Sequence, residues 1–430
     1  MRSLKFPSPA GIAAIPHFAA LRHRDYRSTW VANICSGAAM WTFIVASSWL
    51  VLEDSDSSGW VGVITFSSML PFLLVSPVGG LMADRFDRRG LIVATFILGF
   101  ANMAALATLA LVGVIQLWHV AVLAFTGGML RATQEPTIQA LIPNLVPKED
   151  LLNAITLNSA TRQGARFFGL LVAAPLLAVD FIGVNGVLVL SAVFQAVGAV
   201  QMARTRTASR GESNPQQGLA RSLADGLVFV YSNRTIALFI IIVVFHCALT
   251  MSFESILPVL SREELGAEDG SLLGYLVMGF GVGALVGTLL MAGVRSERRK
   301  GQLVVWTGMA SGIAPMLLAV AGSVPLAVLA SAGMGASQAT FMALTLTYTM
   351  AAAPDRLRGR IASIYVLHAG GIMAFTNLGY GFLADAFSAP PILLVTGTLF
   401  IVVLVGLSVA QPTLRRVYRT GQIALGAQIA

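Results

Sequence analysis

Long apolar runs, separated by short polar segments, make up most of this chain. A helix needs about 20 apolar residues to cross a hydrocarbon core of roughly 30 Å, and about twelve runs reach that length. The predicted spans lie near residues 29–52, 60–82, 90–113, 117–141, 152–178, 182–203, 235–258, 271–293, 302–321, 324–350, 360–383 and 389–411. Every span is expected to be helical, because backbone polar groups have no other partner in lipid. The pattern therefore predicts an all-α polytopic membrane protein with twelve transmembrane helices.

The composition excludes a soluble globular protein, because 56% of the 430 residues are hydrophobic and only 11% are charged. Cys35 and Cys247 both fall within predicted spans, so we expect no disulfide framework. The chain lacks the Gly-x-x-x-x-Gly-Lys-Ser/Thr, His-Glu-x-x-His and Gly-x-Ser-x-Gly motifs. We therefore expect neither ATP hydrolysis by a phosphate loop nor the enzyme chemistry of the other two motifs.

Basic residues follow the predicted topology. If both termini are cytoplasmic, 24 of the 28 Lys and Arg residues fall in cytoplasmic segments, and only Arg262 falls in an outer loop. Such an excess of positive charge on inner segments is typical of polytopic membrane proteins and favours an even number of spans. The net charge of +8 is spread over these loops without a compact basic domain, so we do not expect nucleic-acid binding.

A polar linker divides the chain into two halves of six spans. Hydrophobicity falls over residues 204–234, where Leu219, Leu223 and Leu227 recur at the spacing of a helix lying along the membrane. The predicted units are an N-terminal six-helix bundle over 1–203, this linker, and a C-terminal six-helix bundle over 235–430. Similar residues recur at an offset of 206–212 in the two halves, which indicates a duplication with a substrate path between the repeats.

The most distinctive local sequence joins the second and third spans. Residues 79–90 pass from glycines through Asp84 to three arginines. A carboxylate at the end of a span is costly unless it is paired or meets a helix N-terminus. The segment therefore predicts a cytoplasmic turn in which Asp84 makes a contact that can be broken. On charge alone, the arginines could equally be a topology signal.

The order Gly-x-x-x-Asp-Arg-x-x-Arg-Arg resembles the loop motif of major facilitator superfamily transporters, although Asp87 stands where many members have Gly. The run Leu21-Arg22-x-x-x-Tyr26-Arg27 and the segments 147–151, 223–230 and 354–360 resemble one branch of that superfamily. That branch includes the macrolide efflux pumps and the enterobactin exporter. The resemblance implies two six-helix bundles that rock about a central path and so transport a small molecule by alternating access.

The resemblance also implies a gate at the cytoplasmic face. Asp84 is expected to meet the N-terminus of the eleventh helix, just after Pro354, when the transporter opens outward. Alternatively, Asp84 pairs with Arg88 inside its own turn. The expected gate residues are Gly80, Asp84, Arg85, Arg88, Arg89 and Gly359.

Charged residues inside predicted spans are candidates for proton coupling, because burying them is costly without a function. Arg131 and Glu135 lie one helical turn apart in the fourth span and are predicted to form an ion pair that can be exchanged for a proton. A static pair that braces the kink at Pro136 is the alternative. His246 and Glu254 in the seventh span are further candidates for proton coupling.

Two arginines one turn apart in the fifth span, Arg162 and Arg166, repel each other unless a carboxylate or an anionic ligand lies nearby. Glu135 is the carboxylate expected there, and snorkelling of both arginines to water is the alternative. Aromatic side chains suit an apolar ligand, whereas the arginines suit an anionic one. The expected substrate-cavity residues are Asn33, Trp41, Gln134, Arg162, Arg166, Gln338 and His368.

The sequence and the resemblance together predict a secondary active transporter of the bacterial cytoplasmic membrane, with both termini cytoplasmic. The favoured function is proton-coupled export of a small amphipathic molecule, a drug or a siderophore-like metabolite. The alternatives are a metabolite importer or uniporter of the same fold and, from another class, a membrane enzyme or receptor. We expect a monomer without metal or cofactor, driven by the proton gradient.

Overall fold

The computed structural model describes residues 16–75, 82, 86–207, 209, 219–354 and 357–422. These residues form helices and short connections, with no β-strand among them. The predicted fold class is confirmed.

The first bundle contains six long helices that pack against one another. They are α2 (Arg24–Ser55), α3 (Ser58–Leu74), α5 (Arg88–Val112), α6 (Leu117–Leu141), α7 (Leu151–Leu177) and α8 (Gly183–Ala203). The short helices η1 (Pro16–Arg22), η2 (Ile142–Asn144) and η3 (Lys148–Asp150) lie before α2 and between α6 and α7.

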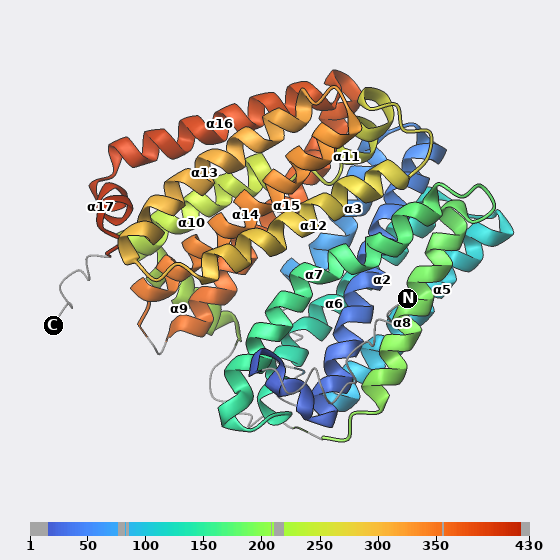
Figure 1. The fold of residues 1–430 in the computed structure, drawn as a ribbon, viewed down its shortest axis with the longest axis horizontal. Coiled ribbons are helices and arrows are strands. Elements are labelled where there is room, and N and C mark those ends of the chain that lie inside the picture. Colours follow the sequence, from blue (N-terminus) through green and yellow to red (C-terminus); the bar gives the residue numbers. More distant parts are fainter. Residues whose placement is uncertain are drawn as a thin grey trace, which may run out of the picture.

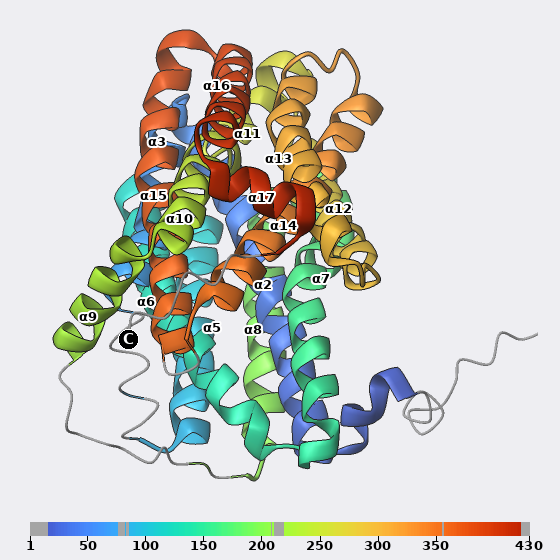
Figure 2. The same ribbon diagram turned by 90° about the vertical axis from the view of Figure 1, so that its left-hand side faces the viewer.

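The second bundle begins with a helix that lies beside α15 (Figure 2). Its elements are α9 (Leu219–Ser232), α10 (Arg234–His246), the π-helical turn η4 (Cys247–Met251), α11 (Leu257–Val259), the π-helical turn η5 (Leu260–Glu264), α12 (Ser271–Ala292), α13 (Glu297–Ala319), α14 (Val324–Ala352), α15 (Arg358–Phe387), α16 (Ala389–Ala410) and α17 (Pro412–Thr420).

The helices match the predicted spans with one correction. Within the described residues, nine helices are long and apolar enough to cross a membrane, taking α10 and η4 together as one, and α3 is apolar but has 17 described residues. The remaining two long helices, α6 and α7, carry the intramembrane charges that make them less apolar. The seventh span was predicted as one helix over 235–258, but the helix ends at Met251.

The two ends of the molecule differ in charge. Arginines and one lysine gather where α5 and α13 begin and where α8 ends, as in the segment 295–300. Carboxylates gather at the opposite end, where α2 ends and α12 begins, as in the segments 53–56 and 263–269. We call these the basic end and the acidic end. The spans therefore have the charge asymmetry expected of a membrane protein with a fixed orientation.

In the part of the chain that the structure describes, the two bundles share a hydrophobic core only near the acidic end. One cluster of buried side chains combines Trp49 and Leu170 of the first bundle with Leu257 and Leu276 of the second. The other clusters belong to one bundle each. In Figure 1 the bundles lie at an angle to each other and meet where α3 runs beside α15 and α7 beside α12.

One face of α7 shows the difference between the two ends most clearly. Near the acidic end, Leu170 and Ala173 on this face are fully buried, and Leu177 is 3% exposed. Nearer the basic end the same face is uncovered, and Ile155 is 43% exposed. Because these positions repeat at helical spacing, one continuous stripe passes from a packed interface to an open surface. Among the described residues, the molecule is therefore closed between its halves at the acidic end and open at the basic end.

Candidate functional site

The break after η4 puts irregular backbone within the predicted seventh span, 235–258. Such backbone is tolerated in a membrane only where protein groups satisfy it. Gln338 Nε2 donates to the Thr250 carbonyl at 2.8 Å, and the Tyr380 hydroxyl donates to the Ala248 carbonyl at 2.7 Å. Asn377 Oδ1 accepts from the Ser255 amide at 3.2 Å. Side chains of α14 and α15 thus bind the free backbone groups of the break, and Glu254 lies within this segment.

Glu254 pairs with an arginine from the other bundle. Arg166 Nη2 on α7 lies 3.3 Å from Glu254 Oε1, and the two side chains are only 11% and 18% exposed. Removing one member of such a pair leaves an unpaired charge in a poorly solvated place, which is strongly unfavourable. The ion pair therefore links the two bundles at the point where the shared core ends.

Two aromatic rings flank the Arg166 guanidinium. Its central carbon lies 3.4 Å from the ring centroid of Trp41 on α2 and 4.5 Å from that of Phe280 on α12. A Cβ at position 281 would lie 3.1 Å from the Cβ of Arg166, so glycine there lets α12 approach this side chain closely. A planar cation is thus held by cation–π contacts and one carboxylate, with partners from both bundles.

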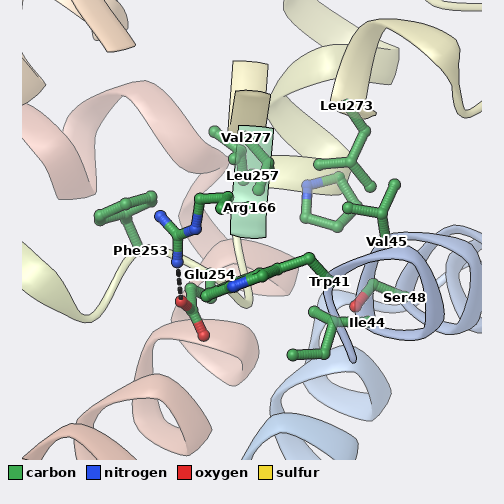
Figure 3. Close-up of a pocket in the computed structure, with 11 residues that line it drawn as sticks. Trp41, Ile44, Val45, Ser48, Arg166, Phe253, Glu254, Leu257, Leu273 and Val277 are labelled. Atoms are coloured by element: carbon green, nitrogen blue, oxygen red, sulfur yellow. Dashed lines mark hydrogen bonds and ion pairs between the residues drawn. The ribbon is translucent and has the colours of Figure 1, made fainter. Parts of the chain in front are cut away.

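A small cavity of about 20 Å³ adjoins this pair, with room for one or two water molecules. Figure 3 shows Trp41 beside Arg166, with the dashed ion pair to Glu254 at the cavity wall. The cavity is mostly apolar and is lined by Trp41, Ile44, Val45, Ser48, Arg166, Phe253, Glu254, Leu257, Pro258, Leu273 and Val277. It combines an apolar surface with one cation and one anion, but it is far smaller than the pockets of about 300–1,000 Å³ that hold drug-sized molecules.

The second predicted ion pair is present in α6. Arg131 Nη2 lies 3.3 Å from Glu135 Oε1, and the Arg131 guanidinium lies 5.1 Å from the ring centroid of Phe72. The Glu135 side chain is 48% exposed, so this pair is far more solvated than the one at Arg166.

The carboxylate that neutralises Arg166 is Glu254, and the expectation that Glu135 does so is wrong. Glu135 is already paired within its own helix, and the break in the seventh span brings Glu254 to α7 instead. Arg162 is exposed on the uncovered stripe of α7, one turn nearer the basic end, and forms no ion pair or hydrogen bond with the described residues.

The other expected cavity residues of the first bundle tie its helices together. Asn33 Nδ2 donates to Asn158 Oδ1 at 3.0 Å, which joins α2 to α7. Gln134 Nε2 donates to Ser36 Oγ at 3.2 Å, which joins α6 to α2. Both contacts fix the helices that carry Trp41, Arg131 and Arg166.

The two histidines expected at the site, His246 and His368, lie apart from the ion pair between Arg166 and Glu254. His246 is fully buried with its ring 4.6 Å from Phe341 and 5.1 Å from Phe400, measured between centroids, and neither ring nitrogen has a hydrogen-bond partner in the described structure. His368 Nε2 lies 2.7 Å from the Tyr231 hydroxyl of α9. Gln338 is also fully buried and supports the helix break.

Half of the expected gate lies outside the described residues, which include neither Gly80 nor Asp84 nor Arg85. Gly359 belongs to the first turn of α15. Arg88 Nη1 donates to the Ala140 carbonyl at 3.0 Å, and Arg89 Nη2 donates to the Ala203 carbonyl at 3.1 Å. These arginines thus join the start of α5 to the ends of α6 and α8, where carbonyl groups attract cations.

Sequence reasoning missed Phe280, Asn377 and Tyr380, although each has a place around the Arg166 pair or the helix break. Asn377 is fully buried in α15, and a polar side chain inside a span was the signal that could have found it. Phe280 carried no signal, because aromatic residues are common in spans. Among the described residues, no group of three or more His, Cys, Asp or Glu side chains could hold a metal ion.

Two helical bundles enclose a charged pair between them and are closed at one end and open at the other. This arrangement defines a multi-pass membrane transporter of the major facilitator type. Residues 15–421 match the model of the transmembrane secretion effector family, and the chain belongs to that family.

Known relatives and structures agree with this class. The multidrug efflux pump Tap of Mycolicibacterium fortuitum is 23% identical over 340 residues, covering 77% of this chain and 82% of the pump. Macrolide efflux protein A of Streptococcus pyogenes is 20% identical over 268 residues, covering 59% of this chain and 66% of that protein. A D-xylose–proton symporter has the same fold, with a TM-score of 0.71 at 14% identity over 93% of this chain and 99% of its own. The protein is a transporter and not an enzyme.

Proposed function

We propose that the protein is a proton-coupled exporter that carries a small amphipathic molecule, a drug or a siderophore-like metabolite, out of a bacterial cell by alternating access. The molecule enters from the open end, reaches the Arg166 site and leaves when the bundles rock to the opposite state. The proton gradient supplies the energy, and no cofactor takes part. The protein acts as a monomer.

The basic end is the cytoplasmic face of the inner membrane in this proposal. Basic residues on inner segments are the main determinant of orientation in such proteins. The first and last described residues, Pro16 and Gln422, both lie at the basic end, which supports cytoplasmic termini. The structure then corresponds to an inward-facing state, the one that loads a molecule for export.

The inter-bundle ion pair between Arg166 and Glu254 carries this proposal. A deprotonated Glu254 holds Arg166 and thereby the two bundles. A proton that reaches Glu254 from the outer side neutralises the carboxylate and frees Arg166, so that the outer end can open. The pair between Arg131 and Glu135 is the second site at which proton binding changes the local charge. Proton binding and the state of the bundles are coupled in this way.

The route to the site favours a molecule with both apolar and polar parts. Arg162 stands on the uncovered stripe of α7, where a polar group of the entering molecule meets it first. The cavity beside Trp41 admits only water in this state, so its apolar lining contacts the apolar part of the molecule only after the bundles move apart there. The efflux activity named for Tap and for macrolide efflux protein A supports the outward direction.

Transport in sealed vesicles tests the proposal. Purified protein is reconstituted with a pH-sensitive dye inside, and amphipathic compounds such as a macrolide or a tetracycline are added under an imposed proton gradient. Export by antiport requires compound and protons to move in opposite directions, whereas import by symport requires the same direction. Compound movement that is independent of the gradient would contradict proton coupling.

The carboxylates are compared in the same assay. Glu254→Gln is expected to abolish gradient-driven movement, and Glu135→Gln to weaken it. Glu264→Gln is the matched control, because Glu264 is an exposed carboxylate of η5 outside the site. If Glu254→Gln transports with normal coupling, Glu254 is not the proton carrier.

A further inference from the structure

The last described helix, α17, packs on the second bundle at its basic end, against the start of α13. In Figure 2 it runs across the direction of α16. The two elements touch through their backbones, because a Cβ at Gly301 would collide with the Val417 carbonyl oxygen. The face of α17 turned to the bundle is formed by the buried side chains Leu414, Val417 and Tyr418. The remaining side chains of α17 are therefore held in fixed positions on the surface.

Arginines occupy the outer face of these two elements. Glu297 is the only carboxylate in the segments 293–300 and 411–422, and its Oε1 lies 2.7 Å from Lys300 Nζ. The arginine side chains of the two segments are exposed and form no hydrogen bond or ion pair with the described residues. We call them the arginine patch, which consists of Arg295, Arg298, Arg299, Arg415, Arg416 and Arg419.

The arginine patch is unfavourable without an anionic partner. Arg298 and Arg299 lie in the first turn of α13, where the helix dipole repels cations. Arg415 and Arg419 lie one turn apart on α17, a spacing at which like charges destabilise a helix. Basic residues on inner segments orient a membrane protein, but that role does not require them to be held together on packed helices. The patch therefore fits an anion that contacts several arginines at once.

Apolar side chains beside the patch indicate that this anion is a lipid. Trp306 lies two turns after Arg299 on the same face of α13 and is 70% exposed. About 10 Å separates the two positions along the helix axis, so a headgroup at Arg299 has its acyl chains beside Trp306. Tryptophan is enriched at the boundary between headgroups and hydrocarbon. Val409, near the end of α16, is 67% exposed and adds apolar surface next to α17.

We propose that the arginine patch binds the headgroups of anionic phospholipids such as phosphatidylglycerol, whose acyl chains lie along Trp306 and the outer face of α13. Phosphate oxygens accept charge-assisted hydrogen bonds from guanidinium groups. Because several arginines of one packed surface act on the same headgroups, the patch binds these lipids more tightly than basic residues elsewhere at the basic end. Bound lipid offsets the repulsion within the patch and so stabilises α17 on α13. The proposal depends neither on the transported molecule nor on proton coupling.

Native mass spectrometry of the full-length protein in detergent tests the lipid site. The protein is titrated separately with dioleoyl-phosphatidylglycerol and dioleoyl-phosphatidylcholine, which share their acyl chains and differ in headgroup charge. We expect the wild type to bind phosphatidylglycerol at least about fivefold more tightly, the effect of a single arginine near an anionic surface. The triple variant Arg415→Gln, Arg416→Gln, Arg419→Gln should lose most of this preference. Glutamine keeps the helix propensity of arginine, and all three positions are exposed, so α17 should remain folded.

A matched control removes the same charge from the basic end of the first bundle. Arg27, Arg204 and Arg206 are exposed there, and replacing all three by glutamine should keep the preference for phosphatidylglycerol. A wild type without this preference, or an equal loss in both triple variants, would overturn the lipid site. If free glycerol 3-phosphate binds as tightly as phosphatidylglycerol, the ligand is a soluble phosphate and the lipid assignment is wrong.

A variant of α13 separates lipid binding from the folding of α17. Arg298→Gln with Arg299→Gln leaves α17 unchanged and should also weaken the binding of phosphatidylglycerol. Wild-type affinity in this variant would show that α13 and α17 do not form one site. No transported compound or proton gradient is present, so these outcomes are independent of whether the proposed exporter function holds.

Discussion

The ion pair between Arg166 and Glu254 should be energetically coupled, and a double-mutant cycle measures that coupling. The variants are Glu254→Gln, Arg166→Met and the two together. Removing one member of a buried pair costs about 3–5 kcal/mol, because the remaining charge is left unpaired. Both side chains here keep some exposure, 11% and 18%, so we expect about 2 kcal/mol for each single variant.

The double variant should lose much less than the sum of the two. No unpaired charge remains in it, and methionine can contact the Trp41 ring in place of the guanidinium, which contributes about 0.3–1.5 kcal/mol. We expect a total loss of about 1 kcal/mol, which gives a coupling energy of about 3 kcal/mol, at the upper end for residues in contact.

Thermal unfolding of the purified protein in detergent ranks the variants. For a unit the size of one bundle, each kcal/mol lowers the midpoint by about 2–4 °C. The single variants should therefore melt about 4–8 °C below the wild type, and the double variant above both of them. Arg131→Met and Glu135→Gln provide the control cycle, because a solvated pair one helical turn apart contributes only about 0.3–0.5 kcal/mol.

Two results would refute this reasoning. If Glu254→Gln melts with the wild type, the carboxylate does not neutralise a buried Arg166. If the losses of the two single variants simply add in the double variant, the two side chains do not interact in the folded protein.

Three further predictions concern the parts around the site. Asn377→Ala removes the acceptor of the Ser255 amide in the helix break and should lower the free energy of unfolding by about 1–3 kcal/mol, measured by the same melting assay against the exposed control Thr398→Ala. Gly381→Val places a side chain against the Ser58 carbonyl and should open the acidic end. Spin labels attached at Val114→Cys and Gly322→Cys should then lie farther apart. A distance equal to that of the wild type would contradict the close approach of α3 and α15 at Gly381. Arg162→Gln should leave the melting midpoint unchanged, because Arg162 is exposed and unpaired among the described residues. The same variant should raise the compound concentration needed for half-maximal transport. If that concentration is unchanged, Arg162 does not lie on the entry route.

Much of the candidate site could be predicted from the sequence because charged residues are rare in spans and are therefore conspicuous. This reasoning identified Arg131, Glu135, Arg166 and Glu254, and the pair between Arg131 and Glu135 follows from helical spacing alone. The partner of Arg166 did not follow, because it comes from a segment 88 residues away, across the boundary between the bundles. A pairing between helices depends on how whole bundles pack, and helical periodicity does not contain that information.

The helices and their number follow from the amino-acid sequence alone, because hydrocarbon allows only fully hydrogen-bonded backbone and each helix is defined by its own run of apolar residues. The excess of basic residues at one end of the spans likewise follows from the sequence. The tertiary structure alone decided where the seventh span breaks, since the break exists only because Gln338, Asn377 and Tyr380 supply the missing backbone partners. It also decided that the bundles meet at the acidic end and part at the basic end. That choice depends on contacts between distant segments, such as Asp385 with the start of α3, whose energies are small enough to be reversed when the bundles rock.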